Sequence, residues 1–530
     1  MTTHAEDVDV LVVGYGPAGA AIAGLLGRYG VRTLVVDKAK DIFMAPRAVA
    51  LDNEALRILQ MVGIRPDAFA QVAIPYVRMH SPKLGQFAQV NTAGSIDGLP
   101  KLVTFYQPEL EQLLRAHAEQ QSGVSARTGV EMVRFTEEQD GVTAVLRTSD
   151  GAEEVVRAKY LVGTDGASSK VRAAIGEGFD GMTYGEDWLV VDALGVPNNI
   201  DHVEFLCDPA RPAVHMVAPG GRTRWEFMLR PGETREQMEK DSNVEELLRP
   251  WGEPGTLRIE RKAVYRFQAR VCSRFSKGRV FLVGDAAHLT PPFVGQGLVA
   301  GLRDVGNLAW KLAWVLKGRA APSLLETYDQ ERRPLAARMV ALARWMGRLV
   351  MPQTRLHALA IHGGLHLLRG LPQVRSFIDE LGIKPVNSYC EGFFVEGRGA
   401  IQRGSWFPQG LVRDVTGGLA LSDDVLGSGF SIVGLGANPA ATVSPVIARA
   451  WTDAGGSFVE VRPRGLAPSR EATEDLDNTL VPGAAPFGWC VVLRPDRTVL
   501  HDGTAGAADA LVRESLAFLG AKGTARRATA

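Results

Sequence analysis

The stretch from Val8 to Asp37 decides the fold, and it is written VDVLVVGYGPAGAAIAGLLGRYGVRTLVVD. An apolar, largely β-branched run opens it and predicts a buried strand. A GxGxxG pattern follows at residues 14–19, and residues 20–29 have the composition of a helix. Residues 31–37 predict a second strand. The stretch therefore predicts a βαβ unit with an acidic residue at its far end.

The glycines of this unit have the spacing of a dinucleotide-binding site. Gly14 permits a tight turn, Gly16 lets the backbone approach a pyrophosphate, and Gly19 allows the helix to pack closely on the strand. Asp37 lies 18 residues past Gly19, where a carboxylate can accept hydrogen bonds from an adenosine ribose. The alternative is a glycine-rich turn without a ligand. The agreement of both strands, the helix and the acid favours dinucleotide binding, but it does not separate FAD from NAD.

Composition limits the other classes of function. The 530 residues are 46% hydrophobic and 22% charged, which predicts a globular chain of two to four domains at roughly 100–200 residues each. The 59 basic residues balance the 59 acidic ones, so no nucleic-acid or membrane partner is indicated. The N-terminus lacks the pattern of a signal peptide, and no apolar run reaches the length of a membrane span. We therefore expect a cytoplasmic protein.

The chain has four cysteines, which are Cys207, Cys272, Cys390 and Cys490. They form no CxxC pair and no zinc-binding spacing. Free cysteines are mostly buried, so we expect four buried or inert thiols and no metal site.

Two further stretches repeat the order of strand, glycine turn and helix. Residues 279–283 predict a strand that runs into Gly284-Asp285, and a helix is expected after Gly295-Gln296-Gly297. Residues 160–163 predict another strand, followed by Asp165-Gly166 and a short helix. The alternative for this last stretch is an ordinary Asp-Gly turn that caps a helix.

In this order and spacing, the three motifs resemble those of the class A flavoprotein aromatic hydroxylases, which have the para-hydroxybenzoate hydroxylase fold. Within that family the chain is most similar to the 3-(3-hydroxyphenyl)propionate hydroxylase type. The supporting stretches are Pro46-Arg47-Ala48, Leu51 to Arg57, Cys207-Asp208-Pro209, Arg211-Pro212, Glu226-Phe227-Met228, Pro231 to Thr234, and Gly295 to Leu312. The resemblance covers about residues 8–390.

The resemblance implies both a fold and a reaction. The implied fold is α/β, with a Rossmann-like FAD-binding domain, an interleaved β-sheet substrate domain, a helical segment and a C-terminal thioredoxin-like domain. The implied ranges are 1–180 and 276–394 for the two parts of the FAD-binding domain with the helical segment, 181–275 for the substrate domain and 395–530 for the C-terminal domain. The implied reaction is hydroxylation of a small phenolic or related aromatic compound with FAD, NAD(P)H and O₂, through a flavin C4a-hydroperoxide.

The resemblance also implies which residues contact the cofactor. In chain order they are Gly14, Gly16, Pro17, Ala18, Gly19, Asp37, Lys38, Arg47, Gln107, Asp165, Gly284, Asp285, Pro292, Gly295, Gly297, Leu298 and Val299. Asp37 would hold the adenosine ribose, Arg47 would reach the FAD phosphates, and Gln107 would lie near the ribityl chain. Many relatives have Asn where this chain has Val299, which removes a side-chain hydrogen bond near the flavin.

Four residues are candidates for the substrate pocket, and no catalytic residue is assigned. The candidates are His215, Arg224 and Tyr265 from the β-rich stretch, together with Pro292, whose carbonyl the resemblance places near the reacting hydroxyl. Glu226 is a further polar residue that could reach a pocket. A surface or structural role is the alternative for each of the charged or polar ones. We expect His288 to order the flavin loop rather than to act in catalysis.

The remaining segments give weaker expectations. Residues 320–385 are helix-rich and could supply the surface of a homodimer. The thioredoxin-like region lacks CxxC, so a redox role is not expected. Gly434-Leu435-Gly436 is interpreted as a turn because Pro439 stands where a third glycine would be needed. Residues 521–530 are expected to be disordered.

Two other functions remain open at this point. One is a different reaction of the same superfamily, such as halogenation or epoxidation, although the tryptophans form no WxWxIP pattern. The other is an FAD-binding protein without catalysis, which the complete set of three flavin motifs disfavours.

Overall fold

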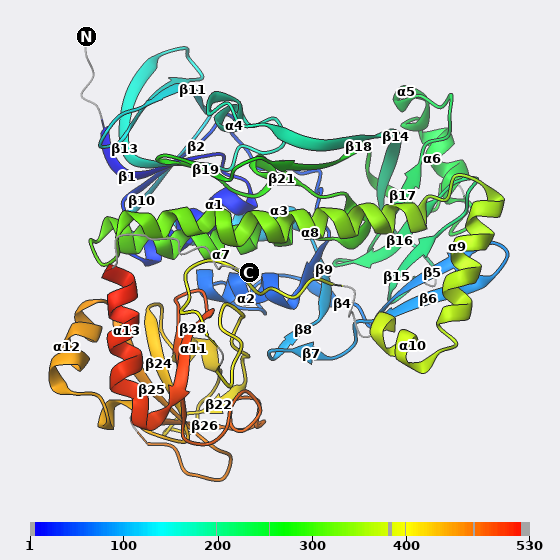
Figure 1. Ribbon diagram of the computed structural model, residues 1–530. Coiled ribbons are helices and arrows are strands. Elements are labelled where there is room, and N and C mark those ends of the chain that lie inside the picture. Colours follow the sequence, from blue (N-terminus) through cyan, green and yellow to red (C-terminus); the bar gives the residue numbers. More distant parts are fainter. Residues whose placement is uncertain are drawn as a thin grey trace.

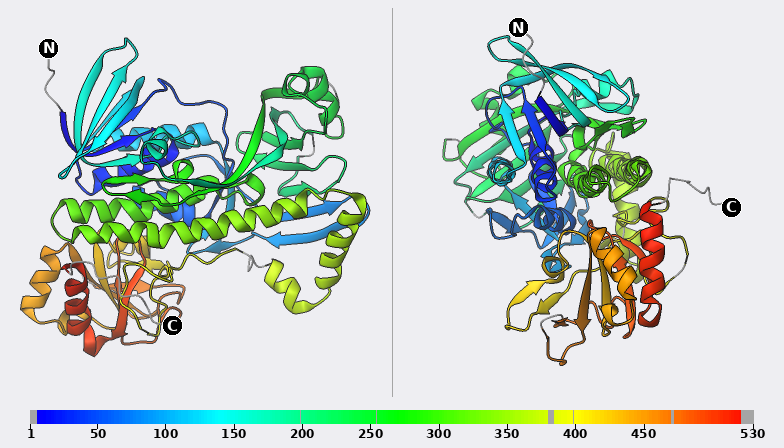
Figure 2. Two further views of the ribbon diagram at one scale, coloured as in Figure 1. Left: turned by 45° about the horizontal axis from the view of Figure 1, so that its top comes forward. Right: turned by 90° about the vertical axis from the view of Figure 1, so that its left-hand side faces the viewer.

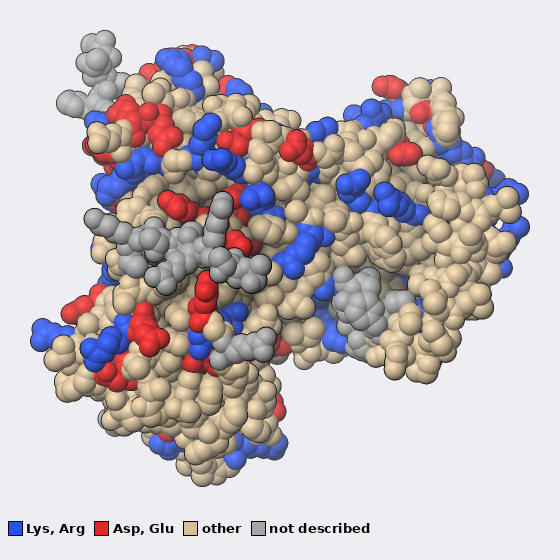
Figure 3. Space-filling model, viewed as in Figure 1, with Lys and Arg blue, Asp and Glu red and all other residues tan. Residues whose placement is uncertain are grey.

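The computed structural model describes residues 6–197, 199–253, 255–379, 384–397, 399–469 and 472–520. Two large sheets lie side by side, two long helices run along them, and a third unit packs beneath the first sheet (Figures 1 and 2). Acidic and basic side chains are interspersed over the first and third units (Figure 3). The expected tail at 521–530 lies outside the described residues.

The first sheet is built around the expected βαβ unit. Its order is β10-β2-β1-β13-β12-β11, and β20 pairs with β13. Strands β1 (Glu6–Val13), β2 (Thr33–Asp37), β10 (Val124–Thr128), β13 (Glu153–Gly163) and β20 (Val280–Leu282) run parallel, while β11 (Val130–Glu137) and β12 (Val142–Thr148) form an antiparallel extension. The strands expected near residues 8–13, 31–37 and 279–283 are thus confirmed.

Helices cover this sheet and begin close to the motifs. They are α1 (Pro17–Arg28), α2 (Asn53–Val62), α3 (Gln107–Glu119), α4 (Lys170–Ala174) and α7 (Gly297–Leu316). Helix α1 begins three residues before the expected start, because the fixed φ of Pro17 suits the first turn of a helix. Helix α7 begins at Gly297, as expected.

The second sheet has the order β21-β18-β14-β17-β16-β15-β5-β6. Its strands are β14 (Phe179–Leu194), β15 (Val203–Leu206), β16 (Ala213–Ala218), β17 (Arg222–Met228) and β18 (Arg258–Cys272), with β5 (Tyr76–Ser81) and β6 (Gly85–Asn91) at one end and β21 (His288–Leu289) at the other. The β-rich region expected at 180–275 is confirmed, but it also contains helices α5 (Arg235–Met238) and α6 (Asp241–Leu248). Strands β5, β6 and β21 come from outside that range, so the sheet is assembled from separate parts of the chain.

The two faces of the second sheet pack against different partners, because side chains alternate along a strand. One face forms a core with Phe293 and with residues of α8 (Thr327–Val350), including Met346. The opposite face forms a core with Met238 of α5 and Val244 of α6. Helix α8 continues into α9 (Arg355–Leu368) and α10 (Pro372–Asp379), which confirms the helix-rich segment. Among the described residues, no helix combines the length and the apolar character needed to cross a bilayer.

The third unit has the thioredoxin-like arrangement. Strand β24 (Phe430–Leu435), helix α12 (Pro445–Asp453) and strand β25 (Gly456–Arg462) form a parallel βαβ crossover. The antiparallel pair β27 (Trp489–Leu493) and β28 (Val499–Thr504) then leads to α13 (Ala508–Gly520). Gly436 adopts a positive φ of 72° directly after β24, which is the expected turn.

A buried ionic network fastens the third unit to the long helices. Glu331 of α8 binds Lys311 of α7 at 2.8 Å and Arg494 of the third unit at 2.8 Å, and all three side chains have 0% exposure. A second contact joins Arg57 of α2 to Asp423 at 2.7 Å. Buried charges are costly unless they are paired, so separation of the third unit from α7, α8 and α2 would leave charged side chains without their partners.

All four cysteines are free thiols, and three of them are buried. Cys390 is exposed, so burial is confirmed for three of the four thiols, and the inertness of Cys390 stays a prediction. Cys390 precedes the third unit, in a segment without regular structure.

Candidate active site

The three motifs meet at one edge of the first sheet. Val13, Gly163 and Leu282 are aligned on the parallel strands β1, β13 and β20, and each is the last or next-to-last residue before its glycine or aspartate turn. Thr164 Oγ1 donates to the carbonyl of Gly14 at 2.7 Å, and a Cβ on Gly14 would lie 2.5 Å from the carbonyl oxygen of Thr164. The carboxyl edge of a parallel sheet is where such folds bind ligands.

The N-terminus of α1 has open space in front of it and tight packing behind it. A Cβ on Gly16 would meet no atom within 4 Å, whereas a Cβ on Gly19 would lie 2.0 Å from the carbonyl oxygen of Gly14. Gly16, Pro17 and Ala18 are half-buried, no side chain caps the helix, and its first turn has no acid. Free N–H groups therefore face the open space, as a pyrophosphate site requires.

The carboxylates of Asp37 and Asp165 are partly engaged by the protein itself. Asp37 accepts hydrogen bonds from the backbone N–H of Tyr15 at 2.7 Å and of Ala39 at 2.8 Å, and Lys38 beside it is exposed. Asp165 accepts from the backbone N–H groups of Lys170 at 2.7 Å and Val171 at 3.2 Å, and so helps Ser169, the N-cap residue, to cap α4. The helix-capping role of Asp165 is therefore present, and its role toward a nucleotide stays a proposal.

The loop that contains Arg47 is held from both sides. Gln107 Oε1 accepts from the N–H groups of Arg47 at 3.0 Å and Ala48 at 2.9 Å. From the second sheet, the Arg224 guanidinium donates to the carbonyls of Pro46 at 3.1 Å and Arg47 at 3.3 Å. The Arg47 side chain itself is exposed, so it is free to turn toward a phosphate.

Asp285 is the residue best suited to a ligand. Its half-buried carboxylate makes no hydrogen bond within the described part of the chain. Burial raises the pKa of Asp285, while His288 and Arg47 act in the opposite direction. A partly desolvated carboxylate without partners is costly until donors reach it. The hydroxyl groups of a ribityl chain supply such donors, so the residues present fit FAD.

His288 belongs to a buried network that supports this loop. Its Nε2 lies 2.7 Å from Asp304 Oδ2. Asp304 on α7 also accepts from the N–H of Gly284 at 3.0 Å and from Arg332 Nε at 2.8 Å. These contacts order the Gly284-Asp285 turn, as we expected for His288. Sequence reasoning did not single out Asp304 or Arg332 as supports.

The segment from Pro292 to Val299 forms a tight turn and then the start of α7. The Pro292 carbonyl accepts from the N–H of Gly295 at 2.9 Å, and Gly295 has a φ of 63°. A Cβ on Gly297 would meet open space, and Leu298 is half-buried. Val299 has 0% exposure and packs in the core, so that its side chain points away from the open space. Backbone groups are therefore what this position offers to a flavin.

Three pocket candidates lie on one face of the second sheet or beside it, and the fourth does not. Arg224 and Asp192 are aligned on β17 and β14, with Arg224 Nε 2.7 Å from Asp192 Oδ1. Arg261 Nη2 lies 2.6 Å from the Tyr265 hydroxyl and also binds Asp192 at 3.2 Å. This face packs on Phe293, the neighbour of Pro292.

His215 lies on the opposite face of the second sheet. Its ring stacks on Trp225 at 5.2 Å, and Trp251 lies edge-on at 5.4 Å. Only 2% of His215 is exposed, and burial lowers its pKa to about 4. The structure therefore does not bring His215 together with Pro292, Arg224 and Tyr265.

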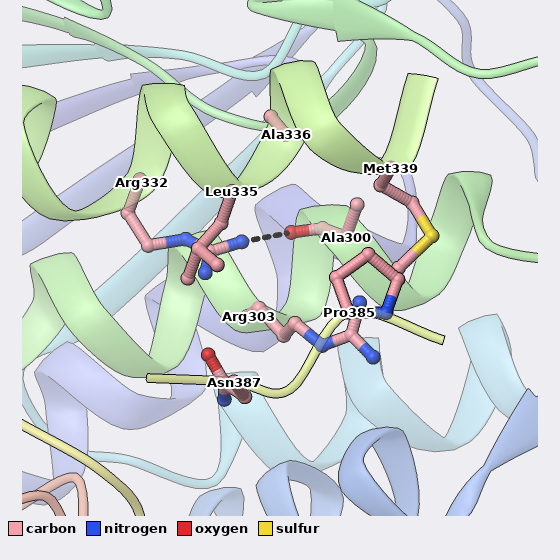
Figure 4. Close-up of a pocket in the computed structure, with 8 residues that line it drawn as sticks. All are labelled: Ala300, Arg303, Arg332, Leu335, Ala336, Met339, Pro385 and Asn387. Atoms are coloured by element: carbon pink, nitrogen blue, oxygen red, sulfur yellow. Dashed lines mark hydrogen bonds between the residues drawn. The ribbon is translucent and has the colours of Figure 1, made fainter. Parts of the chain in front are cut away.

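A small hollow between α7, α8 and the segment after residue 384 is separate from the motifs (Figure 4). It is lined by Ala300, Arg303, Arg332, Leu335, Ala336, Met339, Pro385 and Asn387. Arg303 is paired with Asp52 and Glu54, and Arg332 is paired with Asp304. Because the charges around it are balanced, the hollow offers no free charge to an anionic ligand.

Comparison with known proteins agrees with this arrangement. Residues 7–343 match the family described as FAD binding domain, and residues 404–518 match the HcaD C-terminal domain. By this match the chain is a flavoprotein, and its cofactor is FAD.

Two relatives that align with nearly the whole chain show which class of flavoprotein it belongs to. The 3-(3-hydroxy-phenyl)propionate/3-hydroxycinnamic acid hydroxylase of Burkholderia cenocepacia (strain HI2424) is 37% identical over an alignment of 507 residues, and the alignment covers 92% of this chain and 93% of that protein. The enzyme of the same name from Escherichia coli (strain K12) is 35% identical over 509 residues, covering 93% and 91%. The chain therefore belongs to the FAD-dependent aromatic hydroxylases of the 3-(3-hydroxyphenyl)propionate hydroxylase type.

A solved structure shows the same fold. The flavin-dependent monooxygenase PieE, in complex with FAD and substrate, superposes with a TM-score of 0.80 at 23% identity and covers 97% of this chain and 99% of its own. The expected α/β architecture with a C-terminal thioredoxin-like domain is confirmed.

Proposed function

We propose that this enzyme hydroxylates a phenol with a short carboxylated side chain, of the kind named for its relatives, with NAD(P)H as reductant and O₂ as oxidant. The observation that carries the proposal is the 37% identity to a 3-(3-hydroxy-phenyl)propionate/3-hydroxycinnamic acid hydroxylase over 92% of the chain. At this coverage the match extends across both sheets and the third unit.

The geometry of the motif edge supports the cofactor contacts that we propose. Gly14 to Gly19 would surround the pyrophosphate, Asp37 the ribose, and Asp285 the ribityl hydroxyls. Gly295 to Val299 would face the flavin ring with backbone N–H groups. When bound, FAD supplies the electron transfer and the activation of oxygen, and the protein supplies orientation and exclusion of water.

The substrate would lie between the Pro292 turn and the face of the second sheet that packs on it. Aromatic side chains line this region, with Trp188 and Phe267 stacked at 5.5 Å and Phe293 edge-on to Trp188 at 5.8 Å. Aromatic rings favour such offset and edge-on packing, so an aromatic substrate is suited to this region. Pro292, Arg224 and Tyr265 stay proposed contacts around it.

The test is a product assay on the purified protein. We expect a yellow protein that releases FAD on acid precipitation, oxidises NADH or NADPH with phenols present, and gives a product 16 mass units heavier than the phenol, as roughly expected for one added oxygen. Peroxide is measured in parallel. Flavin binding without any oxygenated product over a broad panel of phenols and heteroaromatics would refute the proposal and favour a non-catalytic flavoprotein.

Location and assembly are part of the same proposal. Free thiols throughout and dependence on NAD(P)H support a cytoplasmic enzyme. Exposed apolar residues of α8 and α9, among them Trp345, Leu356 and Leu367, support a homodimer through this surface. Light scattering of the purified protein measures the oligomeric state directly.

A further inference from the structure

Glu226 lies on the face of the second sheet that packs on the Pro292 turn. On β17 it is aligned with Val190 of β14 and Val214 of β16. Val214 belongs to the apolar core that also contains Phe293. The side chain of Glu226 therefore projects to the face proposed for the substrate, two residues along the strand from Arg224.

Glu226 is buried without a hydrogen-bond partner. Only 8% of the residue is exposed, and within the described ranges of the chain no donor binds its carboxylate. The neighbouring arginines have other partners. Arg224 binds Asp192 and the backbone carbonyls of residues 46 and 47. Arg261 binds Asp192, the Pro46 carbonyl and the Tyr265 hydroxyl. Burial also raises the pKa of Glu226, against the influence of Arg224. A buried carboxylate in this position is stabilised when a hydrogen-bond donor reaches it.

The charges around Glu226 favour a neutral hydrogen-bond donor from the substrate. Arg224 and Arg261 contribute two positive charges, and Asp192 with an ionised Glu226 contributes two negative ones. A second carboxylate from the substrate would leave an unbalanced negative charge in a desolvated region, which is costly. A neutral hydroxyl adds no charge and donates one hydrogen bond.

We propose that Glu226 is a specificity-determining residue whose carboxylate accepts the hydrogen bond of the phenolic hydroxyl of the substrate, while the carboxylated side chain of the substrate points elsewhere. This assignment rests on the proposed function. It orients the ring by its hydroxyl, so that the carbon to be oxygenated has a fixed position relative to the Pro292 turn. Rejection of ligands that lack the hydroxyl follows, because they leave Glu226 buried and unpaired.

The experiment compares a phenol with its methyl ether. Binding of 3-(3-hydroxyphenyl)propionate and of its O-methyl ether to the FAD-loaded protein is followed by the change in flavin absorbance. For the wild type we expect the phenol to bind at least about tenfold more tightly than the ether, as for a hydrogen bond to a charged group. Glu226→Leu should remove this preference by weakening the phenol only, and Glu226→Gln, which keeps an acceptor oxygen, should retain part of it.

A matched control lies in the same sheet. Glu204 of β15 is aligned with His215 and so projects to the opposite face. Glu204→Gln should keep the preference of the wild type. Flavin content and circular dichroism establish that each variant is folded.

The possible outcomes distinguish a failure of the Glu226 assignment from a failure of the proposed function. If the wild type binds and hydroxylates phenols but Glu226→Leu keeps the full preference for phenol over ether, the assignment of Glu226 is wrong and the proposed function stands. If the wild type binds no phenol, the proposed function fails and the assignment fails with it. A loss of phenol and ether binding to the same extent in folded Glu226→Leu also overturns the assignment, because it indicates a general packing role.

Discussion

Gly16 and Gly19 lie three residues apart in one motif, yet a side chain would meet opposite surroundings at the two positions. A Cβ on Gly16 faces open space, and a Cβ on Gly19 would lie 2.0 Å from a backbone oxygen. We therefore expect Gly16→Val to abolish FAD binding while the circular dichroism spectrum stays that of the wild type. Gly19→Val should instead lower Tm or prevent folding. Full flavin occupancy in Gly16→Val would show that the pyrophosphate lies elsewhere.

His215 gives a pH dependence of known sign. The unfolded chain binds a proton at this residue below about pH 6.5, whereas the folded chain binds it only below about pH 4, because burial lowers the pKa. Stability is therefore fully present above pH 6.5 and is lost as the pH falls toward 4, by about 3 kcal/mol at most. We expect Tm of the wild type to fall more steeply between pH 7 and pH 5 than Tm of His215→Phe, which keeps the stacking on Trp225. Parallel Tm curves for the two proteins would contradict this account.

At the same scale, the sequence predicts some site residues and misses others for a physical reason. Asp37 ends strand β2, and Asp165 and Asp285 lie two and three residues past the ends of β13 and β20, so the motif order alone places them at the edge of the sheet. Asp304 lies inside a helix, where a charged residue is usually exposed, and only the packing of α7 shows that it is buried. Glu226 could be named as polar, but the face it occupies depends on strand register, which the sequence does not display.

At the scale of elements, helix α7 connects the flavin loop to the rest of the protein through Asp304. This carboxylate holds the Gly284 turn, His288 and Arg332 together. We expect Asp304→Asn to cost about 3 kcal/mol or more, because it leaves the buried Arg332 without its charge partner. The variant should also bind FAD more weakly, since the Gly284-Asp285 turn loses its support.

Thermal melts and flavin titrations of Asp304→Asn check both parts. The matched control is Asp67→Asn, since Asp67 is paired with Arg65 on the surface and both side chains are mostly exposed. We expect this control to leave Tm and flavin affinity unchanged. If Asp304→Asn has the same Tm and the same FAD affinity as the control, the Asp304 network does not support the flavin site.

The parallel strands of the first sheet could be predicted from the sequence, because each is a short apolar run followed by glycine or aspartate. The second sheet could be predicted only as a β-rich region. The hairpin of β5 and β6 lies more than a hundred residues before β15 in the chain, and the pairing of β5 with β15 is a long-range contact with no local signal. Helices α5 and α6 were missed because they are short and lie within a run of strands.

At the scale of the whole molecule, the polar contacts of the third unit reach α2, α7 and α8, and within the described ranges none is made with the turns at 14–19, 165–166 and 284–285. They include Arg494 with Glu331 and Asp423 with Arg57. We therefore expect a chain truncated after residue 395 to be less stable and less soluble, while flavin reduction per folded molecule survives. Arg494→Met, which keeps the unit but leaves Glu331 without this partner, should lower Tm with no effect on reduction. A folded, FAD-loaded truncation that NAD(P)H cannot reduce would overturn the expectation.

The whole enzyme must also coordinate two nucleotides with one dinucleotide fingerprint. With no second fingerprint in the sequence, the reductant is expected to bind transiently and to reach the flavin through a moving element. Linking that movement to substrate binding limits loss of electrons as peroxide. We expect a good phenolic substrate to accelerate flavin reduction at least about tenfold, equivalent to roughly 1.4 kcal/mol of barrier. Stopped-flow reduction with and without the phenol measures this, and equal rates with a substrate that is hydroxylated would exclude gating.

The position of β20 in the first sheet has a consequence for biosynthesis. This strand pairs with β13, but Val280 follows Gly163 in the chain only after the long strands of the second sheet have been made. At the usual rates of translation, the ribosome needs roughly 6 to 25 seconds to add that intervening stretch. Throughout this interval β13 has an open edge, and neither Asp285 nor α7 exists to complete the nucleotide cleft. We therefore expect the nascent polypeptide to capture its coenzyme only after β20, Asp285 and α7 have been made.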